Sequence, residues 1–121
     1  FAQLAKERNV MVIGVTSLEY SESVISRHPS GKKMHHFADV VLDNKAPKGD
    51  AVLEDSGMPQ RFTPVSGVTS IVLLHALVSA SIEELLRRGI TPPVFQAANV
   101  DGGREYNARL IQQYRDRIFY L

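Results

Sequence analysis

The chain has 121 residues, with 14 lysines and arginines against 13 aspartates and glutamates, and it contains no cysteine. A net charge of +1 gives no electrostatic case for a nucleic acid or an anionic membrane as partner, and zero cysteine excludes disulfides, Cys-ligated zinc and thiol catalysis. A hydrophobic fraction of 44% is typical of a soluble globular protein, and the lack of cysteine fits a reducing compartment, so we expect a cytoplasmic location.

The first elements alternate between helix and strand. Residues 1–9 read as the last turns of a helix, which leads us to expect the C-terminal part of a larger domain. Residues 10–15 form a continuous, β-branched apolar run, typical of a parallel strand covered on both faces. Residues 39–43 are the next strand, and the connection between the two is long enough for a crossover. Its helix is predicted at 30–38, and the resulting order indicates an α/β fold.

The middle of the chain combines a long loop with the longest predicted helix. Residues 44–60 are rich in proline, glycine and aspartate and predict a loop, with short edge strands at 51–54 and 61–63. A helix is predicted over 64–88, with Thr63 as N-cap and Pro64 at the first helical position. This helix is apolar almost all round, so we expect it to be central or in a subunit interface. The serines, threonine and histidine within it argue against a membrane span.

The last helix is predicted over about 104–120, after a short extended piece at 93–97. Asp101 is its expected cap. Every fourth residue from Tyr106 onward is apolar or aromatic, which indicates the inner face of this helix. That face consists of Tyr106, Leu110, Tyr114 and Ile118.

Polar side chains follow both predicted parallel strands. Ligands of an open parallel sheet bind beyond the carboxyl ends of its strands. Thr16, Ser17 and Glu19 follow the first strand, and the same segment continues to His28. Lys45 follows the second strand. We therefore expect hydroxyls, carboxylates, a histidine and a lysine at one rim of the sheet.

The start of the long helix is a second candidate binding region. Ser66 and Thr69 lie in its first turns, where unpaired N–H groups and a partial positive charge favour a phosphate. Serine and threonine at a helix start are commonly only caps. For Thr63 the cap role is favoured, and for Ser66 both roles stay open.

The four histidines have different expected roles. His35 and His36 are neighbours on a predicted helix, so we expect them to point to different sides and not to share a metal. His75 is expected to be a core or interface residue. His28 lies in a polar loop and is the histidine favoured for acid–base chemistry, because imidazole titrates near neutral pH.

Two carboxylates are candidates for a general base. Glu19 suits proton abstraction next to a carbonyl if it is partly desolvated, and a water-facing role is the alternative. Glu22 is expected to face water. We predict no metal site and no cofactor, and the motifs of nucleotide hydrolysis, hydride transfer and the common hydrolases are absent.

Several motifs together resemble a known family. They are Thr16-Ser17, the run Ser-Arg-His-Pro-Ser-Gly-Lys at 26–32, Ala-Asp-Val-Val-Leu-Asp-Asn at 38–44 and Gly-Asp-Ala at 49–51. The sequence resembles the second half of a SIS (sugar isomerase) domain over nearly its whole length. It is most similar to bacterial SIS-domain proteins of the phosphosugar-binding or phosphoheptose-isomerase-like group, and its tail resembles theirs as well.

The resemblance implies a three-layer, doubly wound parallel sheet of the flavodoxin or Rossmann-like kind, of which this chain would be the C-terminal half. It implies a phosphorylated sugar as ligand, a homodimer or higher homo-oligomer, and in most members no cofactor. The heptose isomerases carry a Gln-Glu pair where this chain has Thr69 and Ser70, and His75 is out of step with their later histidine. Catalytic residues therefore cannot be transferred by position.

The expected function is a phosphosugar isomerase of the aldose–ketose type. Glu19 or His28 would act as acid or base, with Thr16, Ser17, Ser66 and Thr69 around the substrate. A phosphosugar sensor without chemistry is one alternative, and a sugar-phosphate lyase or etherase on the same fold is another.

Overall fold

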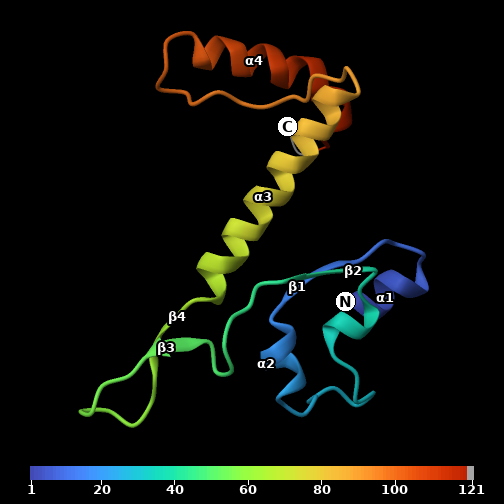
Figure 1. The fold of residues 1–121 in the computed structure, drawn as a ribbon. Helices are drawn as coiled ribbons and strands as arrows, with labels where there is room; N and C mark the ends of the chain where they lie inside the picture. The colour runs from blue at the N-terminus through green and yellow to red at the C-terminus, as the bar shows by residue number, and fades with distance from the viewer. Residues whose placement is uncertain (120–121) are drawn as a thin grey trace. The chain divides into compact units, whose positions relative to one another are not determined.

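A computed structural model describes residues 1–119 of the chain (Figure 1). The chain divides into two compact units, and the boundary follows Ser79. The first unit contains α1 (Ala2–Glu7), β1 (Ile13–Thr16), α2 (Leu18–Glu22), the 3-10 turn η1 (Met34–Phe37), β2 (Val40–Asp43), β3 (Ala51–Leu53), β4 (Phe62–Pro64) and most of α3 (Ser66–Arg87); the second contains the end of α3, α4 (Gly103–Tyr114) and the 3-10 turn η2 (Arg115–Arg117).

The two expected parallel strands are present. β1 and β2 pair in parallel, in a register that runs from Ile13 opposite Val40 to Thr16 opposite Asp43. The connection between them passes through α2 and η1, so the predicted crossover and the α/β class are confirmed. The predicted helix at 30–38 is shorter than expected, because only the four residues of η1 are helical. The sequence predicts no helix at 18–22, where α2 forms.

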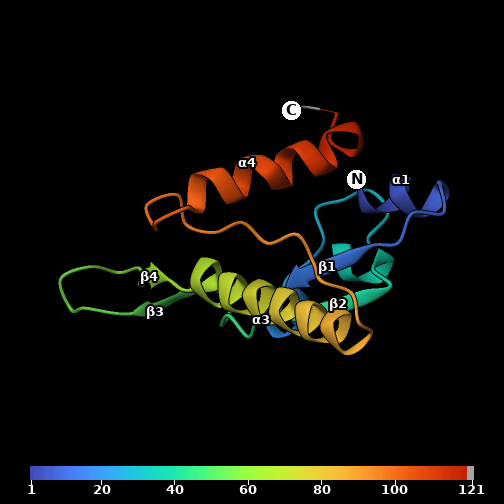
Figure 2. The same cartoon turned by 90° about the horizontal axis from the view of Figure 1, so that it is seen from above.

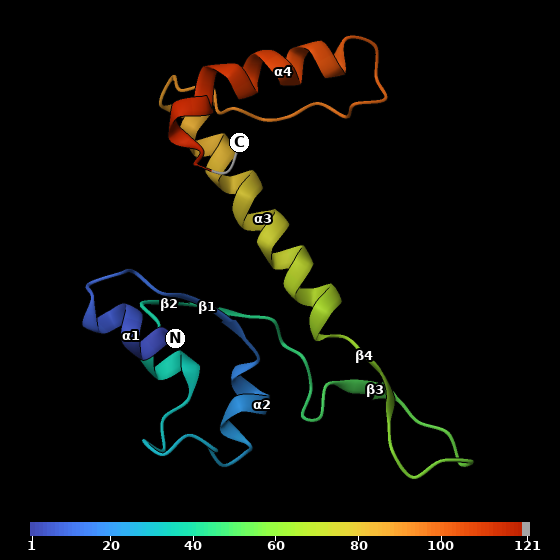
Figure 3. The same cartoon turned by 180° about the vertical axis from the view of Figure 1, so that it is seen from behind.

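The turn η1 packs closely on β1, and α1 lies beside it (Figures 1 and 3). A side chain at Gly14 would collide with the sulfur of Met34 and lie 3.2 Å from the Cβ of Ala38. Asp39 joins α1 to this layer, because it accepts a hydrogen bond from the Lys6 ammonium and another from the Val12 N–H. The Lys6 bond lowers the pKa of the Asp39 carboxyl. Glycine at position 14 thus permits the close approach.

The two short edge strands form a hairpin. β3 and β4 are antiparallel, with Ala51 opposite Pro64 and Leu53 opposite Phe62, and a long loop joins them (Figure 2). This confirms the extended segments expected at 51–54 and 61–63. An ion pair between Arg61 and Glu54, 3.2 Å apart, bridges the base of the loop.

The long helix begins later than predicted. Pro64 ends β4 and α3 starts at Ser66. Thr63 has φ +63°, whereas an N-cap residue adopts an extended backbone, so the expected N-cap role of Thr63 is wrong. At the other end, Gly89 has φ +75° and stops the helix as predicted.

Within the first unit, the apolar face of α3 is exposed. None of its residues is buried, and Val68 and Val72 keep 66% and 64% of their surfaces exposed. The burial expected for a central helix is therefore not observed for α3 within this unit. The helix is also long and apolar enough to cross a membrane, a property that core helices of soluble proteins share.

In the second unit, an extended segment runs along α4 (Figures 1 and 3). The side chain of Asn107 joins the two, because its Oδ1 accepts the N–H of Gln96 at 2.9 Å and its Nδ2 donates to the Gln96 carbonyl at 2.8 Å. The predicted inner face is confirmed within α4, because its members are half-buried and every residue between them except Asn107 is exposed; Ile118, the last predicted member, is half-buried too but lies beyond the end of η2. These members are Tyr106, Leu110, Tyr114 and Ile118.

The start of α4 differs from the prediction. Its N-cap is Gly102 with φ +76°, and no side chain among the described residues caps it, so the expected capping by Asp101 is wrong. The extended piece expected at 93–97 forms no strand. α4 ends at Tyr114 and is followed by η2, and the end predicted at residue 120 lies outside the described residues.

Candidate functional site

The carboxyl ends of β1 and β2 meet at one edge, which we call the rim (residues 16–19 and 43–46). Ser17 is 6% exposed and is the N-cap of α2. Its hydroxyl donates to the carbonyl of Ala46 at 2.6 Å and accepts the N–H of Tyr20 at 3.1 Å. The residue predicted to touch substrate therefore holds the two strand ends together. Thr16, the other predicted hydroxyl, is half-buried directly opposite Asp43.

Charged groups gather on the outer side of the rim. The carboxylate of Asp43 accepts hydrogen bonds from the N–H of Leu18 and from Lys45, whose ammonium lies 2.6 Å away. This bond lowers the pKa of the Asp43 carboxyl and raises the pKa of Lys45. The charge of Glu19 makes a smaller contribution to the raised pKa of Lys45. Of the groups expected at one rim, a hydroxyl, carboxylates and a lysine are thus present, whereas the expected histidine, His28, is bonded within its own loop instead.

Asn44 connects the rim to α3. It is 7% exposed, its Nδ2 donates to the hydroxyl of Ser70 at 3.0 Å, and its Oδ1 accepts the N–H of Ala46 at 3.1 Å. The first turns of α3 therefore lie against the rim, which brings the two predicted binding regions into one neighbourhood.

The start of α3 already holds a carboxylate. Asp50 accepts hydrogen bonds from the backbone of Val65 at 3.1 Å, and from the N–H and hydroxyl of Ser66 at 2.7 and 2.6 Å. Thr69 bonds back to the helix, donating to the carbonyls of Val65 and Ser66. The helix start thus binds an anion, as its N–H groups favour, but that anion is the protein's own side chain.

Replacing Asp50 by asparagine is expected to loosen the first turn of α3. Hydrogen bonds from Ser66, with a smaller one from Val65, lower the pKa of the Asp50 carboxyl below its ordinary value of 3.8. The charged form therefore contributes stability above pH 3.8, and this contribution is lost as the pH falls through the lower folded value. Asparagine keeps an acceptor and tolerates the local φ of +69°, but it lacks the charge that favours a helix N-terminus.

The measurement is amide hydrogen exchange at Val65 and Ser66, read near pH 7 and in acid. Faster exchange in Asp50→Asn near neutral pH, with the difference shrinking in strong acid, is the expected result. A difference that is independent of pH would contradict the role of the charge.

The hydrogen bonds of His28 within the described residues are all local. Its Nδ1 lies 2.7 Å from the hydroxyl of Ser30, and its backbone N–H donates to the hydroxyl of Ser26. It is exposed in the loop between α2 and η1, and among the described residues no hydrogen bond or ion pair joins it to Glu19. The acid–base role predicted for His28 stays a prediction, while Glu19 occupies the rim itself.

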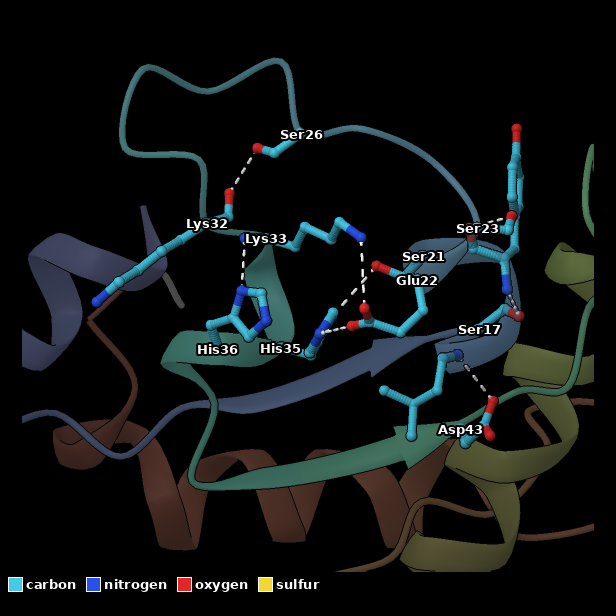
Figure 4. A network of polar contacts seen from close by, with 12 residues as sticks. Ser17, Ser21, Glu22, Ser23, Ser26, Lys32, Lys33, His35, His36 and Asp43 are labelled. Atoms are coloured by element: carbon cyan, nitrogen blue, oxygen red, sulfur yellow. Dashed lines mark hydrogen bonds and ion pairs between the residues drawn. The ribbon is translucent and has the colours of Figure 1, made fainter.

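A second polar group, which the sequence pattern does not predict, lies at the end of α2. Glu22 at the end of α2 and the two histidines of η1 form one cluster (Figure 4). The Nε2 of His35 lies 2.6 Å from a Glu22 carboxylate oxygen, and the rings of His35 and His36 are 4.3 Å apart. The expectation that the histidines point to different sides is therefore wrong. Glu22 is exposed, as expected, and in addition pairs with His35.

Local backbone geometry explains this error. η1 is a 3-10 turn, and the Nδ1 of His36 accepts the backbone N–H of Lys33 at 2.9 Å, in a capping arrangement that holds the ring. The ammonium of Lys33 lies 3.6 Å from Glu22, and its charge, with a bond from His35, lowers the pKa of the Glu22 carboxyl. The available sequence signal was the position of His36. It is the third residue of η1, from which a side chain can accept the backbone N–H of the residue before the turn, Lys33.

Known relatives match nearly the whole of this chain, and their names state no activity. No model of a known protein family matches the chain. A UPF0309 protein of Streptomyces griseus is 44% identical over 119 residues, which are 98% of this chain and 47% of that protein. UPF0309 proteins of Listeria monocytogenes serovar 1/2a and Oceanobacillus iheyensis are 41% and 40% identical over 120 residues, which are 51% and 49% of their lengths. The chain spans about half the length of the curated relatives it matches.

Proposed function

We propose that this chain forms part of a phosphosugar-binding domain of the SIS kind, and that the domain is an aldose–ketose isomerase of the phosphoheptose type. The observation that carries the proposal is the rim, where Glu19 and Lys45 lie beyond the carboxyl ends of two parallel strands whose last pair is Thr16 and Asp43. In α/β sheets this is the edge where ligands bind. The resemblance of the motifs around β1 and β2 to SIS domains supports the same ligand class.

The proposed chemistry is proton transfer through an enediol. The carboxylate of Glu19 would remove a proton from the hydroxyl-bearing carbon next to the sugar carbonyl and return it to the former carbonyl carbon. A second proton would pass from that hydroxyl to the former carbonyl oxygen, so that the carbonyl moves along the chain. Lys45 is 80% exposed and offers a positive charge for the phosphate or the developing oxyanion. Because Asp50 occupies the start of α3, Ser66 and Thr69 would contact sugar hydroxyls rather than the phosphate.

The remaining parts of the proposal concern the larger assembly. The parallel pair β1–β2 would belong to a wider, doubly wound sheet with three layers, of which this chain supplies the C-terminal half. The uncovered apolar face of α3 would be covered within that domain or in a homo-oligomer. The protein would work in the cytoplasm, without a membrane or nucleic acid as partner.

A full-length protein containing this chain should lose turnover of its sugar phosphate when Glu19 is replaced by glutamine. A positioned general base contributes about 10²–10⁴-fold, and Glu19 is exposed, so the fold should be retained. The assay is isomer formation from a panel of aldose and ketose phosphates, with His28→Ala measured in parallel. Unchanged turnover in both variants would rule out the assigned acid–base residues.

The alternative of a sensor without chemistry is tested in the same protein. Phosphorylated sugars would then raise the melting temperature without any product, because a ligand that binds only the folded state stabilises it. The unphosphorylated sugars are the matched control. A lyase or etherase would instead release a fragment of the substrate, and no stabilisation by any phosphosugar would contradict all three versions.

A further inference from the structure

The cluster of Glu22, His35 and His36 has the composition of a metal site. Each residue offers one ligand atom, and the three atoms all lie within 4.8 Å of one another. We propose that this cluster binds one divalent transition-metal ion, with zinc as the fitting representative. The proposed isomerisation makes no use of such an ion, so this site goes beyond the proposed function.

A metal ion could replace the proton that His35 and Glu22 share in the central contact of the cluster. His35 Nε2 and a Glu22 oxygen are 2.6 Å apart, which is a short hydrogen bond with the proton between them. Two ligands about 2.0 Å from a tetrahedral ion are separated by about 3.3 Å. A small outward movement of the exposed Glu22 side chain, 60% of which is accessible, is therefore enough to admit the ion.

The surroundings of His35 are those of a metal-bound imidazole. Its side chain is 10% exposed, and its second nitrogen, Nδ1, lies 3.2 Å from the hydroxyl of Ser21 (Figure 4). When Nε2 binds a metal, Nδ1 carries the proton and donates it to this hydroxyl. Such outer hydrogen bonds fix the tautomer and the ring orientation of ligating histidines.

His36 is the weaker ligand of the three. Its Nδ1 accepts the N–H of Lys33, so the neutral ring carries its proton on Nε2. Binding through Nε2 transfers that proton to Nδ1 and ends the bond with Lys33. We therefore expect the loss of His36 to weaken metal binding less than the loss of His35 or Glu22.

Lys33 sets a limit on the affinity. Its ammonium lies 3.6 Å from the second oxygen of Glu22, where it orients the carboxylate but repels a cation. One unit charge about 5 Å from a divalent ion in a water-like medium changes binding by roughly tenfold. Removing this charge should therefore tighten the site.

The ligand set selects the class of metal. Two imidazoles and one carboxylate suit zinc and its neighbours, with a fourth position left for water. Magnesium and calcium prefer ligand sets made of oxygen. The probe ions are therefore Zn²⁺ and, for its visible spectrum, Co²⁺, with Mg²⁺ as the negative control.

The experiment is calorimetric titration of Zn²⁺ into the full chain after treatment with a chelator, near pH 7.5. One ion per chain is expected, with a visible absorption band for Co²⁺ and no response to Mg²⁺. His35→Gln and Glu22→Gln should each weaken binding by about tenfold or more, and Lys33→Met should tighten it by roughly tenfold. His28→Gln is the matched control, because it removes a histidine outside the cluster.

Circular dichroism of the metal-free variants separates loss of ligand from loss of fold, and the exposed His36 provides a second ligand variant should His35→Gln unfold. The proposal is overturned if Zn²⁺ binds equally well to the control and to both ligand variants, or if it does not bind to the folded chain. Sugar-phosphate stabilisation measured after chelation tests the proposed function separately, so either proposal can fail alone.

Discussion

Replacing Ser17 by alanine is expected to lower the free energy of unfolding of the first unit by about 2–4 kcal/mol. The hydroxyl performs two tasks in a buried position. It caps α2 by accepting the Tyr20 N–H, and it donates to the carbonyl of Ala46, which is 1% exposed. Loss of an N-cap costs about 1 kcal/mol, and a buried carbonyl left without a donor costs a further ~1–3 kcal/mol.

Hydrogen exchange of the α2 and rim amides, together with denaturant unfolding, measures this effect. Ser23→Ala is the matched control, because the Ser23 hydroxyl bonds to a carbonyl of the same helix but is exposed; its cost should stay within about 0.5 kcal/mol. Equal effects of the two substitutions would contradict the role assigned to burial.

Ser17 should also be coupled to Asn44. Both side chains hold the backbone of Ala46, one through its carbonyl and the other through its N–H. In a double-mutant cycle with Asn44→Ala, the two costs should therefore fail to add, by at least about 0.5 kcal/mol. Strict additivity would show that the two strand ends are held independently.

Replacing Gly103 by alanine is expected to destabilise the second unit by about 1–3 kcal/mol. Gly103 is buried at the first position of α4. A Cβ there would collide with the backbone carbonyl of Ala97 and lie 3.1 Å from Val100. Because the obstacle is backbone, the turn before α4 must shift, and this shift would strain the hydrogen bonds between Gln96 and Asn107.

Gly67→Ala is the matched control for this substitution. Gly67 lies in the first turn of α3, where a Cβ would meet nothing within 4 Å. In a helix, alanine is favoured over glycine by roughly 0.5–1 kcal/mol, so Gly67→Ala should stabilise. The measurements are helical circular dichroism and amide exchange across α4. An α4 that is as protected in Gly103→Ala as in the unmodified chain would contradict the predicted collision.

The sequence pattern was sufficient for the elements whose signals are local. The apolar run before Thr16 and the one before Asn44 predicted the parallel strands, since strands covered on both faces lack alternation. Gly89 predicted the end of α3 because only glycine readily adopts its φ of +75°. Strand order and the carboxyl-end rule then placed Glu19 and Lys45 at one rim before any contact was known.

Other features depend on partners distant in the sequence, and no local pattern reveals them. The cap of α3 is Asp50, which is 16 residues before Ser66 and reaches it because the β3–β4 hairpin folds back. Ser17 is structural because Ala46, 29 residues away, lies beside it. Glu22 meets His35 because the crossover returns η1 to the end of α2.

By itself, therefore, the sequence determined the α/β class, the approximate bounds of α3, the start of α4, and which rim collects polar groups, because these follow from residue type and short-range periodicity. The tertiary structure alone decided which of those groups are free for a ligand. Serine and threonine at a helix start form the same sequence pattern whether their hydroxyls face a bound phosphate or a carboxylate of the protein itself. Only the hydrogen bonds formed on folding show that Ser17 holds the rim and that the Ser66 hydroxyl donates to Asp50, and only folding brings Glu22, His35 and His36 together.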